Sequence, residues 1–234
     1  MSLQRTTLVP GYGALNPRQQ RIAELAGLGY TNGEIGGELG ITESAVKSAL
    51  HVIFDRLGIW NRVELANRLA RREELESAES RIETSRLQEL ASRRILDTPR
   101  EPDFEDLVAL MRYVCQTPIA TLTLIDAKRQ WFKAEHGLGV RETSRNLSFC
   151  AHVIRGSELM EVYDATRDKR FRRNPLVTDD PCIRFYAGVP LLTEDGYGLG
   201  TVCAIDRVPR KLSEDQQEAL RAIGRIAMRL LDKS

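Results

Sequence analysis

The sequence of 234 residues has few of the side chains from which small metal and disulfide scaffolds are built. It contains four cysteines, at positions 115, 150, 182 and 203, and three histidines. No two cysteines form a C-x-x-C pair, which excludes a zinc knuckle, and their wide spacing gives no sign of a disulfide scaffold. Free thiols of this kind fit a reducing compartment.

Long apolar runs are also missing. No stretch is long enough to cross a membrane, and the first 20 or so residues contain no apolar segment of signal-peptide length. We therefore expect a cytoplasmic protein.

The chain has almost no excess of charge. Its 34 Lys and Arg residues against 33 Asp and Glu residues leave a net charge of +1. Overall charge therefore does not favour nucleic acid or anionic membranes, and any polyanion must be bound locally. With 42% hydrophobic and 29% charged residues, the composition is that of a globular protein, and the length favours two small domains.

A segment without glycine or proline divides the chain. Residues 71–96 are built from strong helix formers, whereas both flanks are richer in glycine, proline and aromatic residues. Apolar residues recur there every three to five positions and form a one-sided stripe. We interpret this segment as a helical linker and dimerisation helix between a first domain, residues 1–70, and a second, residues 97–234. The alternative is a solvated linker helix that lies on its own domain.

The first domain contains three signals for the start of a helix. Asn16 stands before a proline, as an N-cap residue often does, and Thr31 with Glu34 has the spacing of a capping box. Thr42 is the expected N-cap of a third helix over residues 43–57. Two helices that meet across a short turn containing glycine predict an all-α helix-turn-helix, whose second helix can enter the DNA major groove.

Seven short motifs within residues 15–65 carry a family resemblance. They are, in chain order, Leu15-Asn16-Pro17-Arg18, Asn32-Gly33-Glu34-Ile35, Leu39-Gly40-Ile41-Thr42, Val46-Lys47, Ile53, Arg56-Leu57-Gly58 and Asn61-Arg62-Val63-Glu64-Leu65. Together they resemble the LuxR-type helix-turn-helix. The resemblance implies sequence-selective binding to double-stranded DNA, usually as a dimer, through the helix that follows Thr42. The candidate DNA-binding residues are Thr31, Asn32, Thr42, Ser44, Lys47, Ser48, His51 and Arg62.

The first domain departs from this family at several positions. Ala45 and Ala49 stand where the family commonly has a threonine and a histidine, and the pair Gly36-Gly37 should weaken the second helix. Residues 42–57 carry two fixed positive charges and two negative ones. Since phosphate neutralisation supplies most non-specific DNA affinity, we expect a lone domain to bind weakly. The alternative is a helical module kept for packing or protein contacts.

The second domain combines helices with strands. A helix is expected over residues 104–114, and the alternation over residues 119–125 followed by 130–134 predicts a hairpin. Further strands are expected at residues 159–163, 185–192 and 199–205, and a closing helix follows a capping box that begins at Ser213. This pattern predicts an α+β domain with an antiparallel sheet, joined to the first domain by a long helix.

Five blocks of the second domain carry a second resemblance. They are Asp126 to Ala134, Ser148 to Ile154, Asp164 to Val177, Ile183 to Leu191 and Leu199 to Asp206. In this order they resemble the GAF domain, in particular a subgroup that often accompanies bacterial histidine kinases and diguanylate cyclases. The resemblance implies a small-molecule pocket on one face of the sheet, a dimer formed through the terminal helices, and a regulatory role.

The candidate pocket residues come from these blocks and combine aromatic rings with a few polar groups, as ligand sites require. They are Trp131, Phe149, Cys150, His152, Tyr163, Asp164, Phe171, Asn174, Arg184 and Tyr186. Ordinary core packing is the alternative for the aromatic residues. We expect His152 to be structural rather than a metal ligand, and no metal site or certain cofactor is predicted. The basic loop 167–173 could hold an anionic ligand, or it could simply face solvent.

A catalytic alternative arises from the cysteines. Some GAF domains reduce free methionine sulfoxide with cysteines that resolve one another, but the spacing of the cysteines here does not match that pattern. No phosphate-binding glycine loop, serine triad or carboxylate cluster is present in the sequence. We therefore expect a protein that is not an enzyme.

The sequence as a whole predicts a one-component transcriptional regulator. In this hypothesis the GAF domain senses an unidentified small molecule and controls DNA binding by the helix-turn-helix. The expected partners are DNA, the small molecule and a second copy of the chain, paired through helix 71–96 and the C-terminal helix, with no membrane involved. The alternative is a dimeric signalling module that mediates protein contacts and whose helix-turn-helix no longer binds DNA.

Overall fold

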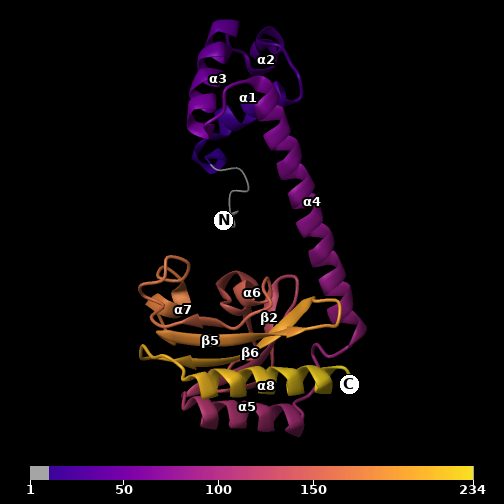
Figure 1. Ribbon diagram of the computed structural model, residues 1–234, viewed down its shortest axis with the longest axis vertical. Helices are drawn as coiled ribbons and strands as arrows, with labels where there is room; N and C mark the ends of the chain where they lie inside the picture. Colours follow the sequence, from indigo (N-terminus) through magenta and orange to yellow (C-terminus); the bar gives the residue numbers. More distant parts are fainter. Residues whose placement is uncertain (1–10, 234) are drawn as a thin grey trace. The chain divides into compact units, whose positions relative to one another are not determined.

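The computed structural model describes residues 11–233, and the chain divides into two compact units after Arg81 (Figure 1). The prediction that no signal peptide is present rests partly on residues 1–10, which lie outside the described residues. Across 11–233, no helix has both the length and the apolar character needed to cross a bilayer. Each unit is described by itself below.

The first unit is helical. After the short 3-10 helix η1 (Tyr12–Ala14) come α1 (Pro17–Gly27), α2 (Asn32–Leu39), α3 (Glu43–Leu57) and the start of α4 (Arg62–Ser92). The three predicted N-caps are confirmed, because Asn16, Thr31 and Thr42 each accept a hydrogen bond from the third residue of the helix they precede. One apolar core joins these helices, formed mainly by Ile22, Leu25, Ile35, Val46, Leu50, Ile53, Leu57 and Leu65.

The turn between α2 and α3 explains why Gly36 is a glycine. Gly40 ends α2 in the left-handed conformation, with φ of 63°, and the amide of Ile41 donates back to the Gly36 carbonyl at 2.9 Å. A Cβ on Gly36 would lie 2.6 Å from the Ile41 carbonyl oxygen, whereas a Cβ on Gly37 would meet nothing within 4 Å. The two glycines that should weaken this helix are therefore not equivalent, since Gly36 is needed for the close approach of the turn.

This difference predicts opposite effects for two adjacent substitutions. Gly36→Ala should destabilise the helix-turn-helix unit by about 1–3 kcal/mol, because the methyl group meets backbone that cannot move away. Gly37→Ala should stabilise the same unit by about 0.5–1 kcal/mol through helix propensity. Thermal unfolding of the two full-length variants beside the wild type measures both. Equal shifts in the two variants would contradict this account of the turn.

The second unit is built on one antiparallel sheet with strand order β3-β2-β1-β6-β5-β4. Its strands are β1 (Ile119–Ile125), β2 (Arg129–His136), β3 (Glu142–Ser144), β4 (Met160–Val162), β5 (Phe185–Leu192) and β6 (Gly198–Asp206). Helices α5 (Pro102–Cys115) and α8 (Glu214–Leu231) cover one face, and the short helices α6 (Cys150–Val153) and α7 (Pro175–Thr178) lie on the other (Figure 1). The predicted α+β fold with an antiparallel sheet is confirmed.

Alternation along β1 divides the sheet between two cores. Leu122 and Leu124 belong to the core under α5 and α8, whereas Ile119 and Ile125 belong to the core on the side of α6. The alternating pattern that predicted this strand thus reflects burial on both faces, with apolar side chains directed to each. The face towards α6 also carries threonines and cysteines, which are described with the site below.

Several predicted boundaries were wrong. The helix expected over residues 71–96 begins at Arg62 and ends at Ser92, and the chain after it takes positive φ values at Arg94 and Asp97. The helix starts earlier because Asn61 caps it, its side chain accepting from the amide of Glu64 at 2.9 Å. The elements β3, η2 (Arg145–Leu147), α6 and α7 were not predicted, since each has only three or four residues.

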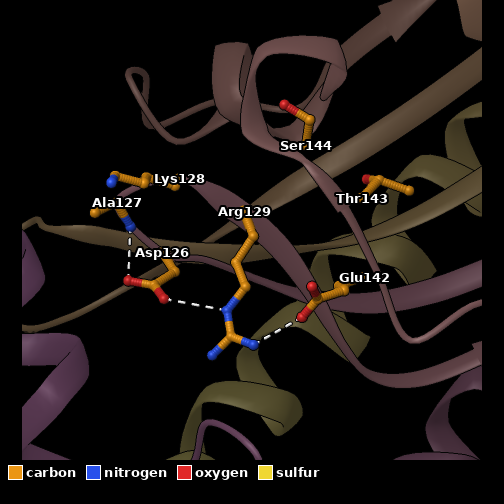
Figure 2. Close-up of a pocket in the computed structure, with 7 residues that line it drawn as sticks. All are labelled: Asp126, Ala127, Lys128, Arg129, Glu142, Thr143 and Ser144. Atoms are coloured by element: carbon orange, nitrogen blue, oxygen red, sulfur yellow. Dashed lines mark hydrogen bonds and ion pairs between the residues drawn. The ribbon is translucent and has the colours of Figure 1, made fainter.

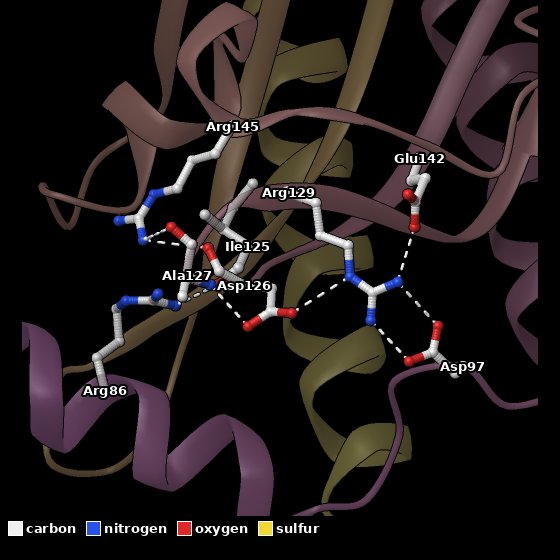
Figure 3. A network of polar contacts seen from close by, with 8 residues as sticks. All are labelled: Arg86, Asp97, Ile125, Asp126, Ala127, Arg129, Glu142 and Arg145. Carbon is white, nitrogen blue, oxygen red and sulfur yellow. Dashed lines mark hydrogen bonds and ion pairs between the residues drawn. The ribbon is translucent and has the colours of Figure 1, made fainter. Parts of the chain in front are cut away.

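The C-terminal part of α4 is attached to the second unit by a buried arginine. The guanidinium of Arg86 donates to the carbonyl of Ile125 at 2.7 Å and to that of Gly198 at 3.3 Å. It also pairs with Glu83 at 2.8 Å, and Arg145 pairs with the same carboxylate at 2.6 Å. Figure 3 shows Arg86 and Arg145 reaching this end of β1 from two sides. The end of α4 is therefore part of the second unit, as the buried Leu90 also indicates.

The charge on Glu83 supports this attachment. Partial burial raises its pKa, but hydrogen bonds from Arg86 and Arg145 outweigh that effect and lower the pKa to about 2, from an ordinary value of 4.5. A carboxylate whose pKa is lower in the folded state stabilises the fold above its unfolded pKa, and this contribution disappears as the pH falls from about 4.5 towards 2.

Glu83→Gln should therefore destabilise the second unit at neutral pH but not in acid. We expect a loss of about 1–2 kcal/mol at pH 7, reduced from the full pKa shift because the side chain is partly exposed. The difference from wild type should shrink as the pH approaches about 2–3. Urea unfolding across this range measures it, with the exposed Glu79→Gln as control. A loss of stability that does not depend on pH would argue against the ion pair.

Candidate DNA-binding helix and ligand pocket

Helix α3 presents one polar face. Ser44, Lys47, Ser48 and His51 recur at helical spacing and are all exposed, while Val46, Leu50, Ile53 and Leu57 bury the opposite face. The hydroxyl of Ser48 donates to the Ser44 carbonyl at 3.1 Å. Four of the eight candidate DNA-binding residues therefore lie together on the exposed face of the expected recognition helix.

The other four candidates hold the unit together through their side chains. Thr31 and Thr42 cap α2 and α3, and Thr31 exchanges hydrogen bonds with Glu34 in a capping box. The guanidinium of Arg62 donates to Asn32 Oδ1 at 2.6 Å and to the carbonyl of Tyr30. These contacts give each of the four residues a structural role whether or not DNA is bound.

Formal charge around α3 is balanced. Residues 11–70 contain six basic and six acidic side chains. Arg56 is directed back to the Ala14 carbonyl at 3.2 Å and to Gln19 at 3.1 Å. Lys47 is thus the basic group of α3 that is left on its exposed face.

The second unit contains a cavity of about 180 Å³ on the α6 side of its sheet. Its walls come from β2, β5, β6, the loop after β2, α6 and the segment around α7. The lining residues are Gln130, Phe132, Gly137, Leu138, Val140, Thr143, Phe149, Cys150, Leu176, Asp180, Pro181, Ile183, Tyr186, Ile205 and Arg207. Of the ten candidates, Phe149, Cys150 and Tyr186 line this cavity.

Stacked rings fill the space beside the cavity. Phe149 stacks on Phe171 with ring centres 3.9 Å apart and on Tyr186 at 5.1 Å, and His152 meets the edge of Phe171 at 5.0 Å. Burial, followed by the charges of Arg155 and Arg170, lowers the pKa of His152 and so favours its neutral form. Phe171 and His152 therefore support the pocket wall from behind instead of lining the cavity.

The remaining candidates lie away from the cavity. Trp131 packs in the core under α5 and α8, and Tyr163 is 59% exposed. Asp164 accepts from the amide and hydroxyl of Thr166 in a local turn. Asn174 caps α7 and donates to the Leu147 carbonyl at 2.9 Å, while Arg184 donates to the carbonyls of Val177 and Ile183. The structure brings none of these five polar or aromatic side chains to the cavity wall.

Beneath the pocket, sequence reasoning identified Cys150 and Tyr186 but missed four polar residues, Thr121, Thr123, Thr201 and Cys203. Thr121 and Thr123 of β1, Thr201 and Cys203 of β6, Cys150 of α6 and Tyr186 of β5 are all buried; we call these six residues the thiol–hydroxyl cluster. Thr121 pairs with Cys203, and Thr123 with Thr201, across the β1–β6 ladder. The Thr-x-Thr alternation in β1 was the available signal, because it directs both hydroxyls to one face.

Short contacts connect the members of the thiol–hydroxyl cluster. The Tyr186 hydroxyl donates to Cys150 Sγ at 3.3 Å, and Thr121 Oγ1 lies 2.9 Å from Cys203 Sγ. The two sulfur atoms are 3.9 Å apart. Burial opposes ionisation of Cys150, but hydrogen bonds from Cys203 and Tyr186 lower its pKa, whereas the hydrogen bond to Cys150 and burial raise the pKa of Cys203. Of the two thiols, Cys150 is the one that ionises first.

A second hollow, of about 450 Å³, lies at the surface beside the β1–β2 turn. Figure 2 shows its wall, with Arg129 between Asp126 and Glu142, at 3.2 Å and 2.7 Å. Arg129 also pairs with Asp97 at 2.6 Å, and these carboxylates raise its pKa further. Since its guanidinium is engaged by three carboxylates, Arg129 itself offers a captured anion little free positive charge. Among residues 11–233, no group of three or more His, Cys, Asp or Glu side chains is arranged to hold a metal ion.

A sequence model of the GAF domain matches residues 99–231, more than half of the chain. The chain belongs to the GAF domain family. A second model, that of bacterial regulatory proteins of the luxR family, matches residues 14–69. Both resemblances found in the sequence are therefore confirmed, and the two domains together are those of a regulator with a sensory domain.

Two curated proteins of Pseudomonas aeruginosa are similar to parts of the chain. A cyclic di-GMP phosphodiesterase, PA2567, is 46% identical over 135 residues, and the two-component response regulator PprB is 44% identical over 57 residues. The matches cover 57% and 24% of this chain but only 23% and 21% of those proteins. Among solved structures, the GAF domain of an Acinetobacter phosphoenolpyruvate-protein phosphotransferase is 16% identical, with a TM-score of 0.49, and covers 64% of this chain and 93% of that one.

The site depends on one glycine of β5. A Cβ on Gly188 would lie 2.3 Å from the Tyr186 hydroxyl oxygen and within 3 Å of two ring carbons. Gly188→Ala should therefore displace the tyrosine from Cys150 and from the aromatic stack, and destabilise the GAF unit by about 1–3 kcal/mol. Thermal unfolding and the near-ultraviolet circular dichroism of tyrosine measure the two effects. As control, Gly156→Ala, whose Cβ meets only an ordinary contact at 3.9 Å, should change neither.

Proposed function

We propose that this chain is a one-component transcriptional regulator whose GAF unit senses a small molecule and thereby controls DNA binding by α3. The observation that carries the proposal is the joining of two matched domains, of the LuxR and GAF families, by the single helix α4. Similar segments belong to a phosphodiesterase and to a response regulator, two signalling proteins, which supports a role in signalling.

The size of the cavity limits the ligand. A volume of about 180 Å³ is below the roughly 300–1,000 Å³ of sites for drug-sized molecules. The expected ligand is therefore a small molecule with few heavy atoms, which contacts the ring of Phe149 and the polar groups of Gln130 and Tyr186. The chain acts in this proposal without catalysis and without a resident cofactor.

A series of contacts connects the pocket with α4. Gly198, the first residue of β6, lies so close to the chain after α6 that a Cβ there would be 2.5 Å from the Ile154 carbonyl oxygen. The carbonyl of the same glycine accepts from Arg86 of α4. A ligand that shifts α6 would therefore disturb Gly198 and, through it, the anchor of α4. The ligand can change the free energy of DNA binding by no more than the difference between its own binding free energies for the two conformations of the protein.

Dimerisation completes the proposal, because a two-fold symmetric operator presents two half-sites. Exposed apolar side chains support the predicted pairing through the helices. Tyr113 of α5 is 83% exposed, Ile226 of α8 40%, and Ile82 of α4 59%. We place this dimer in the cytoplasm.

Lys47→Glu tests the DNA-binding part of the proposal. The full-length protein should select genomic fragments that share a palindromic site, with an affinity that falls steeply as salt rises. Lys47→Glu should weaken binding to that site about 10- to 100-fold, because it reverses the exposed charge of α3. The control is Lys211→Glu, the same charge change at an exposed position of the GAF unit, which should bind normally.

The contrary result distinguishes a DNA-binding regulator from a module that mediates protein contacts. If neither wild type nor the control selects DNA, with or without a cell extract to supply a ligand, the helix-turn-helix does not bind DNA. The balanced charge around α3 would then favour a module that mediates protein contacts.

A further inference from the structure

The two sulfur atoms of the thiol–hydroxyl cluster lie beneath the GAF cavity. Cys150 lines the cavity, and Cys203, 3.9 Å from it, lies on the central strand β6 beneath α6. We propose that Cys150 and Cys203 form an oxidisable pair, which a small hydroperoxide entering this cavity converts to a disulfide. The inference rests on the proposed sensory function only for its effect on DNA binding, because the oxidation itself needs the GAF unit alone.

Access to the pair is through the cavity wall. Cys150 is itself almost fully buried, so a reagent reaches it only from the cavity. The rim of the cavity includes Val140, Asp180 and Arg207, all of which are exposed. Since the cavity is small, it admits a hydroperoxide of few atoms and excludes larger oxidants.

The surroundings of the two thiols assign them different roles. Cys150 is contacted by the Tyr186 hydroxyl at 3.3 Å and the Thr123 hydroxyl at 3.8 Å, groups that stabilise a thiolate by hydrogen bonding. Cys203 is contacted by Thr121 and is not among the residues that line the cavity. Cys150 is therefore the attacking sulfur, and Cys203 is the resolving one. The other two cysteines, Cys115 and Cys182, take no part in the thiol–hydroxyl cluster.

The chemistry balances in two steps. The Cys150 thiolate attacks the outer oxygen of the hydroperoxide, the O–O bond breaks, and the departing alkoxide takes a proton to leave as an alcohol, or as water if the oxidant is hydrogen peroxide. Cys150 is then a sulfenic acid. The Cys203 sulfur attacks the Cys150 sulfur, the S–O bond breaks, and the oxygen leaves as water with the Cys203 proton. The protein has lost two hydrogen atoms and the hydroperoxide has been reduced.

Formation of the bond requires movement of α6. A disulfide has its sulfur atoms about 2.0 Å apart, so the pair must close by about 1.9 Å. Cys203 is held by its ladder with β1 and β5, whereas α6 is a helix of four residues. The approach therefore displaces α6, the element whose following residue, Ile154, packs against Gly198.

The test is a count of free thiols in the full-length protein. Reduced wild type is treated with hydrogen peroxide or with the bulkier cumene hydroperoxide, unfolded, alkylated and digested. We expect the four alkylated cysteines to become two after hydrogen peroxide, with the peptides of Cys150 and Cys203 linked. In Cys203→Ser, Cys150 should accumulate as a sulfenic acid that dimedone captures. Cys182→Ser, which removes the half-buried cysteine, should form the same linked peptides as wild type.

A second comparison tests the route. Leu138→Trp places a larger side chain in the cavity wall and should slow the reaction several-fold, whereas Val208→Trp, at an exposed residue outside the wall, should leave the rate unchanged. Four free thiols after treatment, or oxidation of Cys150 without a link to Cys203, would overturn the proposal. A failure of the protein to bind DNA would leave this result standing, since no step of the measurement uses DNA.

Discussion

The buried guanidinium of Arg86 is the interaction on which the attachment of α4 to the GAF unit depends. A charge that is only 4% exposed is costly unless its donors are satisfied. Here the carbonyls of Ile125 and Gly198 and the carboxylate of Glu83 satisfy them. Because these partners come from the end of β1, the start of β6 and α4 itself, the helix can hold this position only while the two strand ends keep theirs. In the proposed mechanism, that dependence is what makes the helix respond to changes in the sheet.

The face of the sheet towards α6 explains the small size of the pocket. On that face β1 and β6 contribute hydroxyls and a thiol, and Tyr186 lies flat across Gly188 to reach Cys150. Stacked rings occupy the adjacent space. The result is a small cavity with a thiol in its wall, and in the proposed function such a cavity suits small molecules better than nucleotides. The helix α6 belongs to this floor and is followed by the residue that packs on Gly198, so pocket and anchor share one neighbour.

Local signals in the sequence were sufficient for the fold and for the starts of most of the longer helices. Asn16, Thr31 and Thr42 were identified as caps because capping involves only the next three residues. The candidate site was predicted less completely, because it depends on strand pairing between distant residues. Trp131 was expected in the pocket. However, β2 has an irregular register opposite Leu122 and Thr123, and the side chain of Trp131 lies in the core under α5 and α8. No periodicity could have shown that Cys203 meets Cys150.

The central claim is that a change in the pocket alters the DNA-binding unit through Arg86. Measuring the operator affinity of two single variants and of the double variant tests it. Leu176→Trp fills the cavity as a ligand would, and Arg86→Met removes the anchor without leaving a small side chain. The account predicts that Leu176→Trp changes operator affinity by at least about 5-fold in the wild-type background, the lower end of typical coupling, and hardly at all beside Arg86→Met. An equal change in both backgrounds would contradict the claim.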